Sequence, residues 1–216
     1  MSGNVLITGT DTGVGKTTLG CALAFALRAR GFRVGVMKPV ETGVEQTPMD
    51  AAALKAAAGS EHPLELICPF RYRAPLAPAV AAEAEGSPLP DMCRIKISFS
   101  EIAAASDIVL VEGAGGLAVP ITWDRNYADL ARELDLGIVL VVANRLGCLN
   151  STLLTLDYAA RRELRVKGFI LNQAQQDNSP AVATNAAALR RLTAVAHLGS
   201  VRYQEPLNLA IVEHFI

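Results

Sequence analysis

Apolar residues in this chain gather in short continuous runs, which alternate with stretches where apolar residues recur every three or four positions. Short apolar runs predict buried strands, and the second spacing predicts the buried face of a helix. Strands are predicted at residues 5–7, 34–37, 107–111, 138–143, 166–171 and 196–201. Helices are predicted at residues 19–27, 49–58, 79–84, 126–134, 150–162 and from Pro180 onward. Ser98-Phe99-Ser100-Glu101 has the form of a capping box and predicts the start of one more short helix.

Strands that alternate with helices are typical of an α/β fold with a parallel sheet, flanked by helices on both faces. A length of 216 residues fits one domain of this kind, and no repeat or flexible linker divides it. We therefore expect a single domain over residues 1–216. Residues 59–91 carry many prolines and are interpreted as an insertion within that domain.

Composition excludes several classes of partner. A net charge of −1 predicts no binding of nucleic acid or of an anionic membrane. Mean hydropathy is positive, at +0.29, yet no stretch approaches the ~18 apolar residues of a spanning helix. The N-terminus enters the first strand at once, so no signal peptide is expected. The four cysteines are scattered, which favours small buried hydrophobic residues in a reducing cytoplasm, and a cytoplasmic location is predicted.

The segment most indicative of chemistry directly follows the first predicted strand: Gly9-Thr10-Asp11-Thr12-Gly13-Val14-Gly15-Lys16-Thr17-Thr18. A buried strand, a glycine-rich turn and a helix form a P-loop, whose backbone N–H groups face phosphates. Lys16 would reach the terminal phosphates and Thr17 would ligate magnesium. Thr10 stands where the usual pattern has its first glycine. The segment predicts a nucleotide phosphate site of the P-loop NTPase type.

Other polar residues follow predicted strands at the same sheet edge, where ligands of open α/β sheets bind. Lys38 ends the second strand, and spacing alone leaves it either solvated or functional. Glu112 ends the third, and the glycines after it suit a magnesium ligand near phosphates. Asp50 lies near a helix start, so it is either a ligand or a simple cap.

Two further strand ends stay open on spacing alone. The helix after Asn144-Arg145-Leu146-Gly147-Cys148-Leu149-Asn150 could receive a carboxylate at its N-terminus, or could be an ordinary capped helix. Asn172 could hydrogen-bond a base edge, or be a turn residue.

Taken in order, these segments resemble the dethiobiotin synthetase family, which uses ATP to close the ureido ring in biotin synthesis. The matching stretches are Gly9-Thr10-Asp11-Thr12, Val14-Gly15-Lys16-Thr17, Lys38-Pro39-Val40, Thr42-Gly43, Val111-Glu112-Gly113-Ala114-Gly115-Gly116 and Leu146-Gly147-Cys148-Leu149-Asn150. The chain departs from some relatives at Gly13, at Ala79 after Pro78, and at Arg202.

The resemblance implies an ATP-dependent cyclo-ligase with a set of site residues. Its ATP-binding residues would be Gly13, Val14, Gly15, Lys16, Thr17, Thr18, Asp50, Glu112, Gly113, Ala114, Gly115, Asn172, Gln173, Val201, Arg202 and Tyr203. Its catalytic residues would be Lys38, Lys16 and Thr12. Its substrate-binding residues would be Thr12, Lys38, Thr42, Leu149 and Asn150. Its magnesium ligands would be Thr17, Asp50 and Glu112.

The resemblance also implies the substrates ATP, CO2 and 7,8-diaminononanoate, and a homodimer with a shared active site. There, the loop at Leu149-Asn150 of one subunit would receive the carboxylate of the substrate bound to the other. The alternative is a partition- or division-type P-loop ATPase. Such proteins usually carry a signature lysine where this chain has Asp11. A third alternative is an ATP-dependent amidoligase of the cobyrinate type. The chain has no room for the glutaminase domain of such an enzyme.

Overall fold

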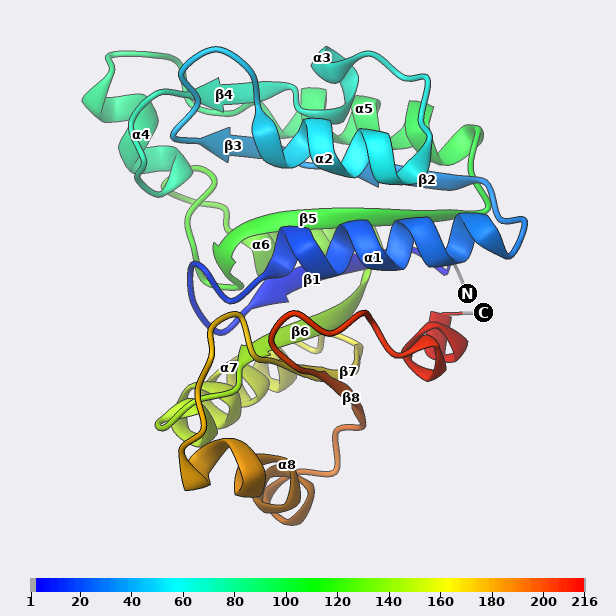
Figure 1. Ribbon diagram of the computed structural model, residues 1–216. Helices are drawn as coiled ribbons and strands as arrows, with labels where there is room; N and C mark the ends of the chain where they lie inside the picture. Colours follow the sequence, from blue (N-terminus) through cyan, green and yellow to red (C-terminus); the bar gives the residue numbers. More distant parts are fainter. Residues whose placement is uncertain (1–2, 216) are drawn as a thin grey trace.

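A six-stranded parallel sheet forms the centre of the computed structural model, which describes residues 3–215 (Figure 1). The strands lie in the order β2-β5-β1-β6-β7-β8. Their bounds are β1 (Val5–Gly9), β2 (Val34–Met37), β5 (Ile108–Gly116), β6 (Gly137–Ala143), β7 (Val166–Asn172) and β8 (His197–Val201). All six predicted strands are confirmed. Because the strands are parallel, their carboxyl ends share one edge, at the left in Figure 1.

Helices cover both faces of the sheet, which explains why its strands are continuously apolar. Val5 and Ile7 pack on one face with Leu23 of α1, whereas Leu6 between them packs on the other face with Ile95 of α5. The longer helices are α1 (Lys16–Ala29), α2 (Met49–Ala58), α5 (Met92–Ala104), α7 (Cys148–Arg161) and α8 (Pro180–Leu192). The shorter ones are α3 (Leu64–Ile67), α4 (Pro78–Ala84), α6 (Tyr127–Glu133) and the 3-10 helix η1 (Leu209–Phe215). The predicted α/β fold is therefore confirmed, while the domain limits 1–216 stay a prediction.

One predicted helix start is wrong. Helix α5 begins at Met92, and not at the Ser98-Phe99-Ser100-Glu101 segment. The Asp91 carboxylate accepts a hydrogen bond from the Cys93 N–H and caps the helix there. Ser98 lies buried in the middle of the helix, because its turn faces the sheet.

The third predicted strand, β5, is longer than its apolar run. It continues through the glycines to Gly116, which pairs with Gly9 of β1. Glu112 therefore lies inside the strand and not at its tip. Residues 59–91 also hold a strand that composition does not reveal: β4 (Phe70–Tyr72) pairs in parallel with β3 (Val40–Thr42).

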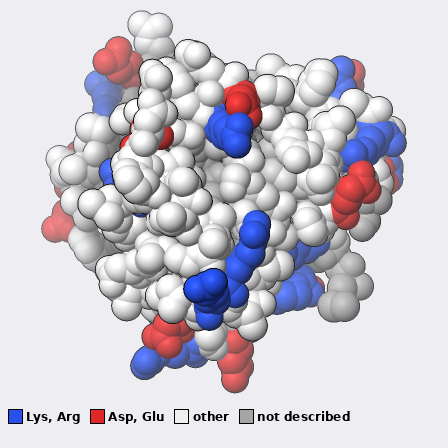
Figure 2. Space-filling model, turned by 60° about the horizontal axis from the view of Figure 1, so that its bottom comes forward, with Lys and Arg blue, Asp and Glu red and all other residues white. Residues whose placement is uncertain are grey.

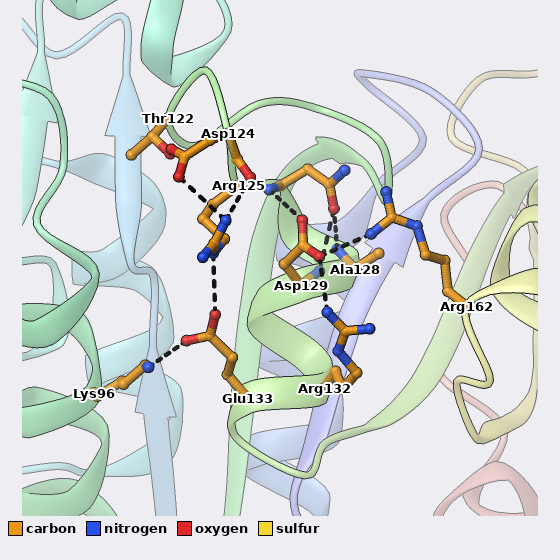
Figure 3. A network of polar contacts seen from close by, with 10 residues as sticks. Lys96, Thr122, Asp124, Arg125, Ala128, Asp129, Arg132, Glu133 and Arg162 are labelled. Carbon is orange, nitrogen blue, oxygen red and sulfur yellow. Dashed lines mark hydrogen bonds and ion pairs between the residues drawn. The ribbon is translucent and has the colours of Figure 1, made fainter.

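Helix α6 is fixed beside the end of β5 by a polar network (Figure 3). Asn126 and Asp129 form a reciprocal capping box at its N-terminus. The Asp129 carboxylate also accepts hydrogen bonds from Arg162 at 2.8 Å and from Arg132 at 3.4 Å. The same helix carries Tyr127, whose ring packs 3.3 Å from the position of a Cβ built on Gly113. The buried Tyr127 ring thereby supports the backbone that follows Glu112.

Charged side chains on the face in Figure 2 lie in small groups separated by wide uncharged areas. This face shows no continuous basic strip of the kind that binds nucleic acid. Within residues 3–215, no helix is long and apolar enough to cross a membrane.

Candidate functional site

The loop between β1 and α1 has the backbone of an anion site. Gly13 and Gly15 adopt positive φ angles of 74° and 91°, a conformation that favours glycine. Gly15 is the N-cap of α1 and supplies no side chain to its first N–H groups. Because α1 has 14 residues and no acidic residue in its first turn, those N–H groups and the helix dipole can face a phosphate.

Asn172 fastens this loop from the end of β7. Its Nδ2 donates a 2.7 Å hydrogen bond to the Val14 carbonyl. A Cβ on Gly15 would lie 2.1 Å from the same nitrogen, so only glycine permits this approach. Spacing suggested a base contact or a turn for Asn172, whereas the structure shows that its amide group holds the P-loop.

Lys16 lies folded against its own loop. Its Nζ donates to the Asp11 carbonyl at 3.1 Å, and the residue is 7% exposed. Burial lowers the pKa of Lys16 below its ordinary 10.5, and the Lys38 charge adds to this effect. Asp11 also pairs with Arg145, 3.3 Å away.

Lys38 stands at the centre of a buried polar cluster. Its Nζ lies 2.5 Å from Glu112 Oε1 and 3.1 Å from Asp50 Oδ2. The Thr17 hydroxyl donates to the same Glu112 oxygen at 2.8 Å. Glu112 and Lys38 side chains are 1% and 4% exposed, while that of Asp50 is 42% exposed. Side chains from β5, α1 and α2 thus meet around one ammonium group at the end of β2.

The charge of Lys38 is maintained by its neighbours. Burial opposes the ammonium most strongly, but the charges of Glu112 and Asp50 and the Glu112 hydrogen bond outweigh it, so the pKa of Lys38 is raised. The contacts with Glu112 and Asp50 therefore favour the charged form of Lys38 beside the P-loop. The solvated reading of Lys38 is wrong, because the side chain is buried and paired on both sides.

A cavity of about 850 Å³ joins the P-loop to this cluster. The predicted site residues that line it are Thr12, Gly13, Gly15, Lys16, Thr17, Thr18, Lys38, Thr42, Asp50, Glu112, Ala114 and Gly115. A second cavity, of about 270 Å³, adjoins it at Thr12 and Gly13 and is lined by Val14, Asn172 and Gln173. Segments far apart in the sequence are therefore brought to one place, as the motifs predicted.

The remaining predicted residues lie outside both cavities. Gly113 is covered by the Tyr127 ring. Leu149 and Asn150 lie in the first turn of α7. Val201 ends β8 beside Asn172, while Arg202 pairs with Glu205 and Tyr203 is 40% exposed. None of these predicted residues lines either cavity, so their roles stay predictions.

The cluster has the donors that magnesium prefers, namely carboxylate and hydroxyl oxygens. Glu112 Oε2 is buried and has no hydrogen-bond partner among the residues described, so one oxygen is free to take a ligand. No group of three or more His, Cys, Asp or Glu side chains in residues 3–215 could hold a metal alone. Two carboxylates and a threonine fit magnesium that shares its coordination with phosphates.

Glu41 belongs to the candidate segment from Lys38 to Gly43 but has no role predicted from the sequence, and it lies in the same cavity. It is 6% exposed, and both of its carboxylate oxygens accept backbone hydrogen bonds from the first turn of α2. Burial raises its pKa. A signal existed: Pro48 stands at the N-cap of α2 and has no side chain that can cap the helix.

Comparison with known proteins gives one consistent result. A family described as "AAA domain" matches residues 3–210. An ATP-dependent dethiobiotin synthetase of Anaeromyxobacter dehalogenans (strain 2CP-C) is 44% identical over 206 residues, which are 95% of this chain and 88% of that protein. One from Xanthomonas euvesicatoria pv. vesicatoria (strain 85-10) is 38% identical over 213 residues, covering 96% of this chain and 94% of that protein.

Solved structures with the same fold are more distant in sequence. A plasmid partition protein from Borrelia burgdorferi, bound to AMPPNP, has a TM-score of 0.58 and 13% identity over 98% of this chain and 95% of that chain. Chloroplast FtsY from Physcomitrella patens has a TM-score of 0.54 and 18% identity, covering 100% of this chain and 65% of that one. These likenesses show the P-loop fold and nothing finer.

Proposed function

We propose a function from one premise: the chain belongs to the dethiobiotin synthetase family. The proposed activity is the ATP-dependent closure of the ureido ring of dethiobiotin, from 7,8-diaminononanoate and CO2, in biotin biosynthesis. One observation supports it beyond family membership. Lys16 begins α1 and Lys38 follows β2, and both line the same cavity beside a loop suited to anion binding.

In the proposed reaction, one amine of the diamine adds to CO2 and loses a proton, which gives a carbamate anion. A carbamate oxygen then attacks the γ-phosphorus of ATP, and ADP leaves with the electrons of the broken P–O bond. The second amine attacks the carbonyl carbon of this carbamic–phosphoric anhydride and loses a proton. Phosphate leaves and the ring closes, so both atoms of the urea carbonyl come from CO2.

Charge neutralisation is the main demand of this chemistry, because a carbamate and a triphosphate are both anions. Lys16 and the loop N–H groups would hold the phosphates. Lys38, whose charged form is favoured by its carboxylate neighbours, would stabilise the carbamate and the charge that builds on the transferred group. Thr12 and Thr42 line the same cavity and would orient the carbamate and the amines. No covalent enzyme intermediate is needed.

Magnesium would be held by Thr17, Asp50 and Glu112, together with phosphate oxygens. When bound, it supplies positive charge to the phosphates during transfer. Lys38 Nζ lies 2.5 Å from Glu112 Oε1, one of the oxygens that would hold the ion, and Lys38 lines the same cavity. Its ammonium would act on the reacting anions from there.

The smaller cavity would bind the base. The amide nitrogen of Asn172 is used by the P-loop, so its side-chain oxygen would accept a hydrogen bond from the base, and Gln173 lines the same cavity. Val201, Arg202 and Tyr203 would complete this site when nucleotide is bound. In the proposed cytoplasmic homodimer, Leu149 and Asn150 of α7 would reach the substrate of the other subunit. The strong exposure of Leu146 just before this helix, at 85%, supports a subunit contact there.

The partition-type alternative shares the fold but not the sequence family. Product formation tests the proposal directly. Purified protein is incubated with ATP, magnesium, bicarbonate and the diamine, and the cyclic urea is detected by mass spectrometry with isotopic bicarbonate. We expect the label in the ring carbonyl. Steady ATP hydrolysis without labelled product would contradict the proposal and favour a switch ATPase.

A further inference from the structure

Helix α2 carries Asp50 into the cluster, yet its N-terminus has no cap of its own. Pro48 is the N-cap residue and no side chain of the helix start accepts a hydrogen bond there. The first turn of any helix leaves N–H groups without intrahelical partners. Here those of Asp50 and Ala51 are satisfied from outside the helix.

Glu41 of β3 provides both acceptors. Its Oε1 accepts from the Asp50 N–H at 3.0 Å, and its Oε2 accepts from the Ala51 N–H at 2.9 Å. The residue is 6% exposed. A two-point contact of this kind fixes both the position and the rotation of the first helical turn.

The geometric consequence concerns the Asp50 carboxylate. Its backbone N–H is held by Glu41, and its own Oδ2 lies 3.1 Å from Lys38 Nζ. Asp50 is 42% exposed at the side chain, so packing alone does not hold it. The contacts of Asp50 with Glu41 and Lys38 therefore hold this carboxylate in the cavity that Thr17 and Glu112 also line.

We infer that Glu41 is a positioning residue. By capping α2 from strand β3, it holds the Asp50 carboxylate next to Lys38, where this carboxylate would also ligate magnesium. The inference rests on the proposed magnesium–nucleotide role of this cluster. Glu41 itself touches no reacting atom. Outer contacts that orient a metal ligand typically change metal affinity by roughly 10- to 100-fold when removed.

The test is calorimetric titration of magnesium in the presence of a non-hydrolysable ATP analogue, with thermal unfolding measured on the same samples. Glu41→Ala should raise the magnesium Kd about tenfold or more. Glu41→Gln keeps one acceptor oxygen and should have a smaller effect. Asp91→Ala is the matched control, since it removes the cap of α5, a helix that does not line the cavity. That control should lower the melting temperature and leave the magnesium Kd unchanged.

A double variant separates positioning from a direct effect. If Glu41 acts through Asp50, then Glu41→Ala should add no further increase of the magnesium Kd to Asp50→Asn. An equal increase in both backgrounds would overturn the inference. So would a Glu41→Ala protein that melts earlier, like Asp91→Ala, with a wild-type magnesium Kd. Should Glu41→Ala fail to fold, Glu41→Gln in the two backgrounds decides by the same criterion. If the Kd of wild-type protein for the nucleotide analogue were the same with and without magnesium, the proposed function would be contradicted instead.

Discussion

Lys38 and Glu112 form an ion pair in the interior, with Nζ 2.5 Å from Oε1 and both side chains almost fully buried. A buried pair of this kind contributes little net stability, because desolvation of two charges offsets their attraction. Its value here lies in placing an ammonium group next to the phosphate loop. Glu112 belongs to β5, which pairs with β2, and Lys38 directly follows β2, so the pair is built from neighbouring strands of the sheet.

Loss of Lys16 should nearly abolish turnover and weaken ATP binding. A desolvated triphosphate then lacks its main cation, which typically costs about 3 kcal/mol in the transition state. Steady-state kinetics and calorimetric ATP binding on Lys16→Ala check this. Near-normal turnover would contradict the assignment of the P-loop.

Asp50→Asn and Glu112→Gln should both raise the magnesium concentration needed for half-maximal activity, because neutral amides ligate a hard cation poorly. They should differ in stability. Glu112→Gln weakens the partner of a buried ammonium, so the free energy of unfolding should fall by up to roughly 3 kcal/mol. Asp50 is half-exposed and caps nothing, so loss of its ion pair with Lys38 should lower the free energy of unfolding by less, on the order of 1 kcal/mol. Equal magnesium titrations for Asp50→Asn and wild type would exclude Asp50 as a ligand.

The P-loop should be weakened from a distance by Asn172→Ala. The variant leaves the buried Val14 carbonyl without its 2.7 Å donor, which typically lowers the free energy of unfolding by about 1–3 kcal/mol. Nucleotide affinity should fall too, because the loop loses its anchor. Gln173→Ala is the control: it lines the same cavity but donates to the Asp177 carbonyl and not to the loop. If urea unfolding gave the same free energy of unfolding for both variants, the proposed stabilisation of the P-loop by Asn172 would be contradicted.

Part of the fold and of the candidate site can be predicted from the sequence, and part cannot. Continuous apolar runs located all six strands, because strands covered on both faces need no polar positions. Ordered motifs located Lys16, Lys38 and Glu112, since the carboxyl ends of parallel strands meet at one edge. The role of Glu41 cannot be predicted from spacing, because its partners are backbone N–H groups of another element. The start of α5 was misplaced because a capping-box pattern occurs inside a longer helix.

Nucleotide binding should depend on alkaline pH through Lys16. Burial, with the charge of Lys38 second, lowers the pKa of Lys16 from 10.5. A lysine with a lowered pKa loses its charge at a lower pH than usual, so ATP affinity should begin to fall below pH 10.5. Removing Lys38 takes away a positive neighbour and leaves three negative ones, Glu112, Asp50 and Asp11.

The fall in affinity should consequently move to higher pH in Lys38→Ala. Calorimetric titrations without magnesium between about pH 7 and about pH 10 measure the shift. A curve that stays in place, or moves to lower pH, would contradict the coupling between the two lysines.

The most direct test of the whole account compares phosphate release in wild-type protein and in Lys38→Ala, with the diamine and bicarbonate present together or singly. Wild-type protein should release phosphate fast only when both are present, because the carbamate is the nucleophile. Lys38→Ala should bind ATP in calorimetry and lose this stimulation. Lys38→Arg should restore little of this stimulation, since a planar guanidinium group does not replace a compact ammonium group in a tight site. Phosphate release from wild-type protein that is indifferent to diamine and bicarbonate would contradict the account.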